Sequence, residues 1–62
     1  MGYEYIAEAR KKKNLTQTKA ASLIGMHQAS YSNIESGKRK PSVDAAKKIA
    51  SVLDVDWKLF FK

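Results

Sequence analysis

The hydrophobic residues of this chain recur mainly at spacings of three and four residues, which is the period of an amphipathic helix. No segment sustains the two-residue alternation of a half-buried strand, and Ala, Lys, Leu and Glu supply helix-favouring stretches. The clearest apolar stripe consists of Val43, Ala46, Ile49, Ala50 and Leu53. The pattern predicts an all-α fold, a compact bundle of about five short helices.

Residues that start and stop helices divide the first part of the chain into three elements. The first helix should cover about residues 3–13, and it carries a basic run near its C-terminus, where cations suit the helix dipole. Thr16 is a good N-cap for a second helix that runs through Ile24, and Gly25 ends that helix in the left-handed conformation. A third helix should cover about residues 28–36 and close at Gly37.

The second part of the chain begins with a basic loop at residues 38–41, because a proline disfavours helical conformation at the residue before it. Ser42 caps a fourth helix, which carries the apolar stripe and ends at Asp54. Asp56 is placed to cap a final short helix. No linker or repeat separates these elements, so residues 1–62 are expected to form a single domain.

Composition excludes several classes of protein. The chain contains no cysteine and only one histidine, His27, so neither a disulfide framework nor a four-ligand structural metal site is expected. An enzyme is not expected, because no paired acid and base stands in an evident site, and no cofactor or small-molecule substrate is indicated. No apolar run is long enough for a membrane span or signal peptide, which predicts a cytoplasmic protein with no membrane partner.

The net charge of +6 favours an anionic partner. A solvated, highly soluble domain is the simpler interpretation of such a charge, so the location of the basic residues has to decide between the two. Membrane-surface binding is less favoured, because the basic residues are spread over several predicted helices and form no lipid-facing stripe.

The segment from residue 17 to residue 36 has the features of two helices that cross closely. Ala21 is small enough to let the second helix approach the third, and Gly25 permits a tight turn between them. With its flanking residues, this segment resembles the phage repressor and Cro type of helix-turn-helix domain, also called Xre-like. The resemblance is carried by residues 15–17, 20–21, 24–26, 31–39, 41–42 and 53–57. It implies a helix-turn-helix within a lambda-repressor-like fold.

One face of the third helix is small and polar. A helix advances about 100° per residue, so the residues opposite Tyr31 and Ile34 share one arc. These residues are Gln28, Ala29, Ser32 and Asn33. Glutamine and asparagine can donate to N7 and accept from N6 of adenine, whereas alanine can meet a thymine methyl group. Together with the resemblance, this arc predicts direct reading of bases in the major groove.

Phosphate contacts require donors and positive charge rather than a particular shape. Gln17 should lie in the first turn of the second helix, where free backbone N–H groups can also face a phosphate, and the resemblance implies the same role for it. Lys11, Lys12 and Lys13 can either face DNA or contribute only to the long-range field. The candidate phosphate contacts are Gln17, Ser30, Lys38, Arg39 and Lys40.

The resemblance also implies an ion pair between Arg10 and Glu35, because members of this family commonly pair these two positions across the first and third helices. We expect a partly buried, bidentate pair that holds the third helix against the first. The chain departs from the family pattern at Ala20, which is small, and at Tyr31, which is large. An exchange of core volume between them is the hypothesis that accounts for both.

One module presents few base-reading side chains, so two copies on a pseudo-palindromic operator are expected, as a homodimer at least on DNA. Trp57 and Phe60 are expected to close the core, which leaves Leu59 and Phe61 as candidate dimer contacts. The leading prediction is a sequence-specific regulator, and by resemblance a repressor, that binds double-stranded DNA in a bacterium, phage or mobile element. The alternative is a protein-interaction module, such as an antitoxin-like partner.

Overall fold

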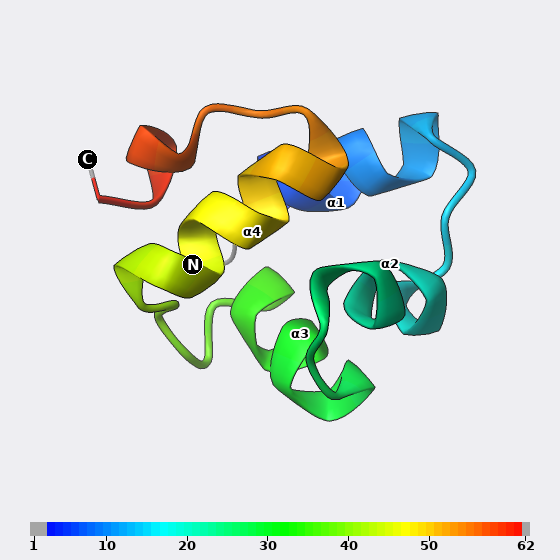
Figure 1. Ribbon diagram of the computed structural model, residues 1–62, viewed down its shortest axis with the longest axis horizontal. Helices are drawn as coiled ribbons and strands as arrows, with labels where there is room; N and C mark the ends of the chain where they lie inside the picture. Colours follow the sequence, from blue (N-terminus) through cyan, green and yellow to red (C-terminus); the bar gives the residue numbers. More distant parts are fainter. Residues whose placement is uncertain (1–2, 62) are drawn as a thin grey trace.

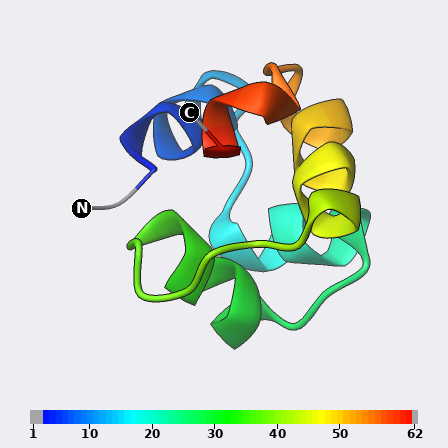
Figure 2. The same ribbon diagram turned by 90° about the vertical axis from the view of Figure 1, so that its left-hand side faces the viewer.

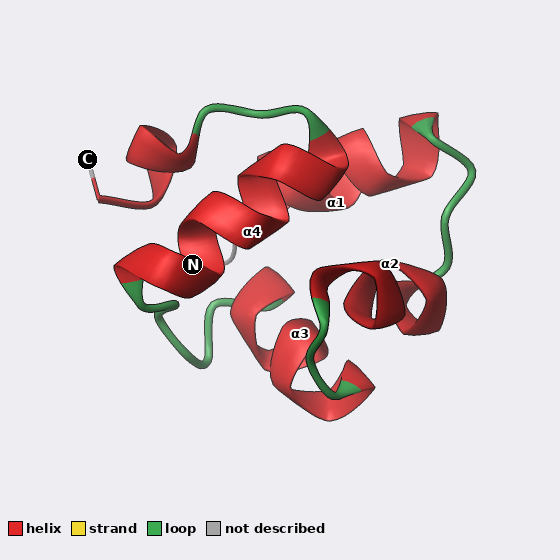
Figure 3. Cartoon of the chain, in the orientation of Figure 1, coloured by secondary structure: helices red, strands yellow, loops and turns green. Residues whose placement is uncertain are grey.

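The computed structural model describes residues 3–61, which form four α-helices and one 3₁₀ helix. The elements in chain order are α1 (Glu4–Lys12), α2 (Gln17–Ile24), α3 (Gln28–Glu35), α4 (Val43–Leu53) and η1 (Trp57–Phe61). The described part of the chain contains helices and loops and no strand (Figure 3). The all-α prediction is confirmed, but the fifth element is a 3₁₀ helix of five residues and not a fifth α-helix. Short terminal segments commonly take this tighter form.

The helix boundaries follow from local chemistry. The Thr16 side chain accepts a hydrogen bond of 3.0 Å from the Lys19 backbone N–H, and Ser42 accepts one of 3.1 Å from the Ala45 N–H. At the other ends, Gly25 caps α2 and Asp54 caps α4, both in the left-handed conformation. All four capping residues were predicted, because each acts on groups within a few residues of itself.

The helices enclose one core. Figures 1 and 2 show α2 and α3 together at one end of the molecule, α1 and η1 at the other, and α4 running between them. Every α-helix and η1 contributes at least one buried apolar side chain. Ala20 and Tyr31 are both fully buried in this core, and Tyr31 is its largest fully buried side chain. The arrangement leaves the outer surface of α3 uncovered by other elements.

One residue of the predicted apolar stripe is exposed in the structure, and a residue at the α2–α3 turn is only partly buried. Val43 is 47% exposed, because it is the first residue of α4 and stands next to the cap, where the apolar stripe has not yet reached the core. Met26 is only partly buried, since it follows the left-handed turn at Gly25 and packs against the core from its edge. In η1, Phe60 is buried and Trp57 packs against the core, whereas Leu59 and Phe61 are 39% and 38% exposed.

Among residues 3–61, no helix combines the length and the apolar character that crossing a bilayer requires.

Replacing Gly25 by alanine is expected to lower the free energy of unfolding by about 1–2 kcal/mol, because an L-residue is strained in the left-handed conformation. The added methyl group meets no atom within 4 Å, so the loss comes from the backbone alone. Gly25→Asn should lose less, since asparagine tolerates this conformation. Urea denaturation measures the free energy of unfolding of the parent and of the two Gly25 variants. Ser22→Ala, on α2, is the control. A Gly25→Ala loss no larger than that of the control contradicts this account.

Candidate nucleic-acid interface

Helix α3 presents one apolar face inward and one polar face outward. Tyr31 and Ile34 are 0% and 2% exposed and pin the helix to the core. On the opposite side, Gln28, Ala29 and Asn33 are exposed and Ser32 is partly exposed. The four predicted base-reading residues therefore share an accessible face, on the end of the molecule formed by α2 and α3 (Figure 1).

The turn between α2 and α3 sets the position of this face. The backbone N–H groups of Gly25 and Met26 both donate to the Ala21 carbonyl, at 2.9 and 3.0 Å, which closes a tight turn at the end of α2. Ala20 and Ala21 are almost completely buried on α2. Small side chains here allow α2 and α3 to pack closely, which is the geometry of a helix-turn-helix.

Arg10 and Glu35 form a bidentate ion pair between α1 and α3. Arg10 Nε lies 3.0 Å from Glu35 Oε2, and Arg10 Nη2 lies 3.1 Å from Oε1. Arg10 Nη1 also donates to the Leu15 carbonyl at 2.8 Å. The side chains of the pair are only 11% and 9% exposed. One guanidinium group thus ties together α1, the loop before α2, and α3.

Two glutamines continue this ion pair toward the surface. Gln17 Nε2 donates to Glu35 Oε1 at 3.1 Å, and Gln28 Nε2 donates to Gln17 Oε1 at 3.2 Å. The sequence identified both glutamines as candidate DNA contacts, but it gave no signal that they bond to each other or to Glu35. Their separations of 11 and 18 residues make these contacts tertiary and invisible to a local pattern.

The surroundings of the Glu35 carboxylate and the Tyr31 hydroxyl shift the pKa of both groups. Burial raises the pKa of Glu35, but the groups around its carboxylate, namely the Arg10 guanidinium, the Tyr31 hydroxyl and the Gln17 amide, outweigh burial, and the pKa lies below its usual value. Burial, and then the nearby Glu35 carboxylate, raise the pKa of the Tyr31 hydroxyl. No group among residues 3–61 makes a hydrogen bond with that hydroxyl. Glu35 is therefore ionised and Tyr31 neutral at pH 7.

The basic loop after α3 is fixed by a single carbonyl. The backbone N–H groups of Lys38 and Arg39 donate to the Asn33 carbonyl at 2.9 and 3.2 Å, and the Ser36 hydroxyl donates to it at 3.2 Å. Lys38 and Arg39 are exposed. Arg39 and Ser30 line the same depression, about 340 Å³ in volume, beside the α2–α3 turn. Lys40 lines this depression too, so three of the predicted phosphate contacts meet there, whereas Gln17 lies on α2.

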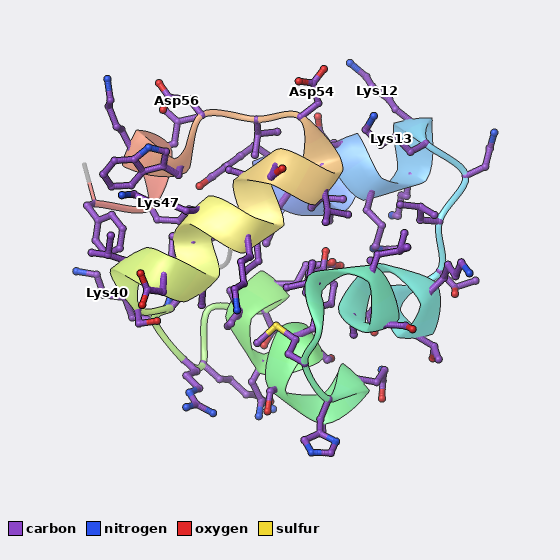
Figure 4. All side chains as sticks on the ribbon, viewed as in Figure 1. Lys12, Lys13, Lys40, Lys47, Asp54 and Asp56 are labelled. Carbon is purple, nitrogen blue, oxygen red and sulfur yellow. The ribbon has the colours of Figure 1, made fainter. Side chains whose placement is uncertain are left out.

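Four of the lysines lie beside groups outside α3. Lys40 Nζ lies 5.3 Å from the centre of the Phe61 ring, and Lys47 Nζ lies 5.0 Å from that of Trp57, so both face η1 (Figure 4). Lys12 and Lys13 line a depression with Asp54 at the end of the molecule away from α3 (Figure 4). Of the two interpretations left open by the sequence, the placement of Lys12 and Lys13 favours the long-range field.

Within residues 3–61, no group of three or more His, Cys, Asp or Glu side chains could hold a metal ion.

Comparison with known proteins places the chain among helix-turn-helix proteins, whose family pattern it matches over residues 6–60. It is 39% identical over 59 residues to the uncharacterized HTH-type transcriptional regulator YqaF of Bacillus subtilis strain 168, covering 95% of this chain and 78% of that protein. It is 37% identical to the HTH-type transcriptional regulator AnsR of the same organism, over 87% of this chain and 47% of AnsR. It is also 37% identical to the ImmF control region 10 kDa protein of Bacillus phage phi105, over 82% of this chain and 57% of that protein. The chain thus spans about half the length of the last two relatives.

Replacing Glu35 by glutamine is expected to lower the free energy of unfolding by about 2–4 kcal/mol at pH 7, because it leaves Arg10 partly buried without its charge partner. Urea denaturation at pH 7 measures this loss. Ser22→Ala serves as the control, since Ser22 is exposed on α2 away from the pair and its replacement should change stability by less than about 1 kcal/mol.

Comparison of the parent with Glu35→Gln at several pH values tests the pKa of Glu35. A carboxylate whose pKa is lower in the folded than in the unfolded state stabilises the fold above the unfolded value, about 4.3, and loses this contribution as the pH falls through the folded value. The difference between the parent and Glu35→Gln should therefore narrow on acidification from pH 5. Equal stability of the two proteins at pH 7 would show that the pair does not hold α3.

Proposed function

This chain belongs to the helix-turn-helix family of DNA-binding transcriptional regulators, and from that premise we propose that it binds a specific sequence of double-stranded DNA with α3 in the major groove. The observation that carries the proposal is the exposed polar face of α3, with Gln17 bonded to Gln28 and with Arg39 sharing a depression with Ser30. An α-helix with its side chains is about 10–12 Å across, which matches the roughly 12 Å width of the major groove.

The members of this face have separate roles in the proposal. Gln28 and Asn33 read base edges, with adenine as the preferred partner, because an amide offers one donor and one acceptor to N7 and N6. Ala29 contacts a thymine methyl group, and Ser32 donates to or accepts from either base of a pair. Long charged side chains are absent from these four positions, so α3 can approach the bases closely.

The phosphate contacts lie around this face. Gln17 is the first residue of α2, where its side chain and the free backbone N–H groups of the first turn face one strand. Ser30, Lys38 and Arg39 contact the backbone on the other side of α3. Lys40 contributes less than these, because its ammonium group already lies over the Phe61 ring.

We further propose that two copies bind a pseudo-palindromic operator whose half-sites lie about 34–36 Å apart. By occupying this operator, they repress transcription in the cytoplasm of a bacterium. Repression by occupying DNA requires no catalytic group. Leu59 and Phe61 in η1 supply the contact between copies, since they are the exposed apolar side chains of that element. The protein-interaction alternative gains no support from the comparisons, whose printed names are those of transcriptional regulators and of a phage control-region protein.

Selection of bound sequences from a random pool of double-stranded DNA tests the proposal. We expect enrichment of one half-site motif in two inverted copies at a fixed spacing. Recovery of sequences without a common motif would contradict sequence-specific binding, and a single motif without an inverted copy would contradict the dimer.

Affinities of variants for the selected site then distinguish residues that read bases from residues that contact phosphate. Gln28→Ala or Asn33→Ala should weaken binding to this site by about 1–3 kcal/mol and relax the preference at one base pair each. Arg39→Ala should weaken binding to all sequences similarly and reduce the salt slope by about one. Fluorescence anisotropy at several salt concentrations measures both quantities.

The matched control for Arg39→Ala is Lys12→Ala, which removes the same charge from the end of the molecule away from α3 (Figure 4). It should leave the salt slope nearly unchanged. The assignment of faces is wrong if Gln28→Ala and Arg39→Ala have the same effects on base preference and on the salt slope. It is also wrong if Lys12→Ala reduces the salt slope as much as Arg39→Ala does.

Replacing Leu59 by lysine tests the proposed contact between copies. We expect about tenfold weaker binding to the full inverted site, because loss of a buried apolar anchor and the approach of two added charges both disfavour pairing. Binding to DNA with one half-site should stay unchanged, which is the internal control. Equal affinity of parent and variant for the full site would remove Leu59 from the interface.

A further inference from the structure

A continuous series of side chains leads from the buried ion pair to the DNA-facing surface. Arg10 holds Glu35, Glu35 accepts from Gln17, and Gln17 accepts from Gln28. Glu35 is only 9% exposed and lies at the C-terminal end of α3, seven residues from Gln28 along the chain. Its carboxylate is therefore placed to act on the surface only through the two glutamines.

We propose that Glu35 is a positioning residue for base recognition, because its carboxylate sets the orientation of the Gln17 amide and, through it, that of Gln28. This inference rests on the proposed function, in which Gln28 reads a base. It assigns a role in specificity to a residue that does not lie on the reading face.

The first step depends on the chemistry of the carboxylate. An ionised carboxylate only accepts hydrogen bonds, so the Gln17 side chain must turn its NH₂ group toward Glu35. Its carbonyl oxygen, Oε1, then faces Gln28. A glutamine amide has almost the same shape in its two orientations, so without the carboxylate nothing in this pair of bonds would select one of them.

The second step fixes the group that meets DNA. Because Gln17 Oε1 only accepts, Gln28 must turn its own NH₂ group toward Gln17. The Gln28 amide then keeps one N–H and its carbonyl oxygen for a base. Adenine offers the complementary acceptor and donor at N7 and N6, whereas guanine offers two acceptors at N7 and O6. The order of donor and acceptor along α3 is thereby set before DNA is bound.

The anchor of the series is rigid enough to impose this order. Glu35 accepts two bonds from one planar guanidinium group, and Arg10 is itself held by the Leu15 carbonyl. Rotation of the carboxylate away from Gln17 would break at least one of these bonds in a partly buried site. The lowered pKa of Glu35 keeps the carboxylate in its acceptor-only form at neutral pH.

Three variants test the inference. Glu35→Gln replaces the acceptor-only group by an amide that can face Gln17 with either end. Gln17→Ala interrupts the series but leaves the Arg10–Glu35 pair intact, so it also covers the case in which Glu35→Gln fails to fold. The double variant Glu35→Gln with Gln17→Glu moves the carboxylate one step along the series, where it again accepts from Gln28. Ser22→Ala on α2 is the control, because Ser22 is exposed and its side chain makes no hydrogen bond among the described residues.

The first measurement needs no DNA. The chain has two glutamines, so the side-chain NH₂ signals of Gln28 can be assigned in ¹⁵N–¹H spectra of the free protein. In Glu35→Gln and in Gln17→Ala these signals should move toward the frequencies of a solvent-exposed glutamine, and in the double variant they should return toward those of the parent. Gln28 signals that stay at the parent's frequencies in the folded single variants would overturn the inference, whatever the protein binds.

The second measurement uses the site recovered by selection, with each base pair of the half-site replaced in turn. At the base pair that Gln28→Ala also affects, the ratio of affinities for the selected and the replaced base pair should fall about tenfold in both single variants. Neither should reduce discrimination further in a protein that already carries Gln28→Ala. The double variant should regain discrimination at that base pair, even though its added surface charge weakens binding to every sequence.

The outcomes separate this inference from the proposed function. Uniformly weaker binding of the single variants, with unchanged base preference, would overturn the positioning role and leave sequence-specific binding intact. Failure of the parent itself to prefer any sequence would overturn the proposed function, and with it the role in base recognition.

Discussion

The Arg10–Glu35 ion pair is the interaction on which the exposed polar face of α3 depends. Helix α3 has only eight residues, too few for its backbone hydrogen bonds alone to keep it folded, so its position has to come from tertiary contacts. Arg10 supplies these contacts from α1, both to Glu35 and to the loop before α2. The two hydrogen bonds between the planar guanidinium and carboxylate groups allow only a narrow range of relative orientations. It fixes how far α3 is rotated as well as where it lies.

The apolar side of α3 imposes the same rotation independently. Tyr31 and Ile34 point into the core, next to an α2 whose buried positions are alanines. A helix locked by these two side chains has no freedom to turn a different face outward, since a change of one position would expose an aromatic ring and bury an amide. The outward direction of the polar face is therefore a consequence of core packing, and the role proposed for the ion pair is to add the amide orientations that packing alone cannot select.

Sequence reasoning succeeded where the cause is local. The caps at Thr16, Gly25 and Ser42 act on neighbouring backbone groups, and the faces of α3 follow from the helical period. It was wrong at Val43, because a periodic pattern does not show where along a helix the core begins. It could not find the bonds of Gln17 to Glu35 and Gln28, because these join three elements whose approach depends on the whole fold.

The distribution of positive charge shows why net charge alone is a poor guide to the interface. Lys12 and Lys13 lie beside Asp54, away from α3, and Lys40 and Lys47 lie over the aromatic rings of η1. These cations still add to the field that attracts a polyanion, which acts over about 8–10 Å at physiological salt, but the domain itself is 20 Å or more across in every direction. In the proposed complex, close contact with phosphate is left to the few donors on and beside α3. In that complex, the lysines away from α3 therefore serve the approach to DNA, whereas the side chains on and beside α3 serve the bound state.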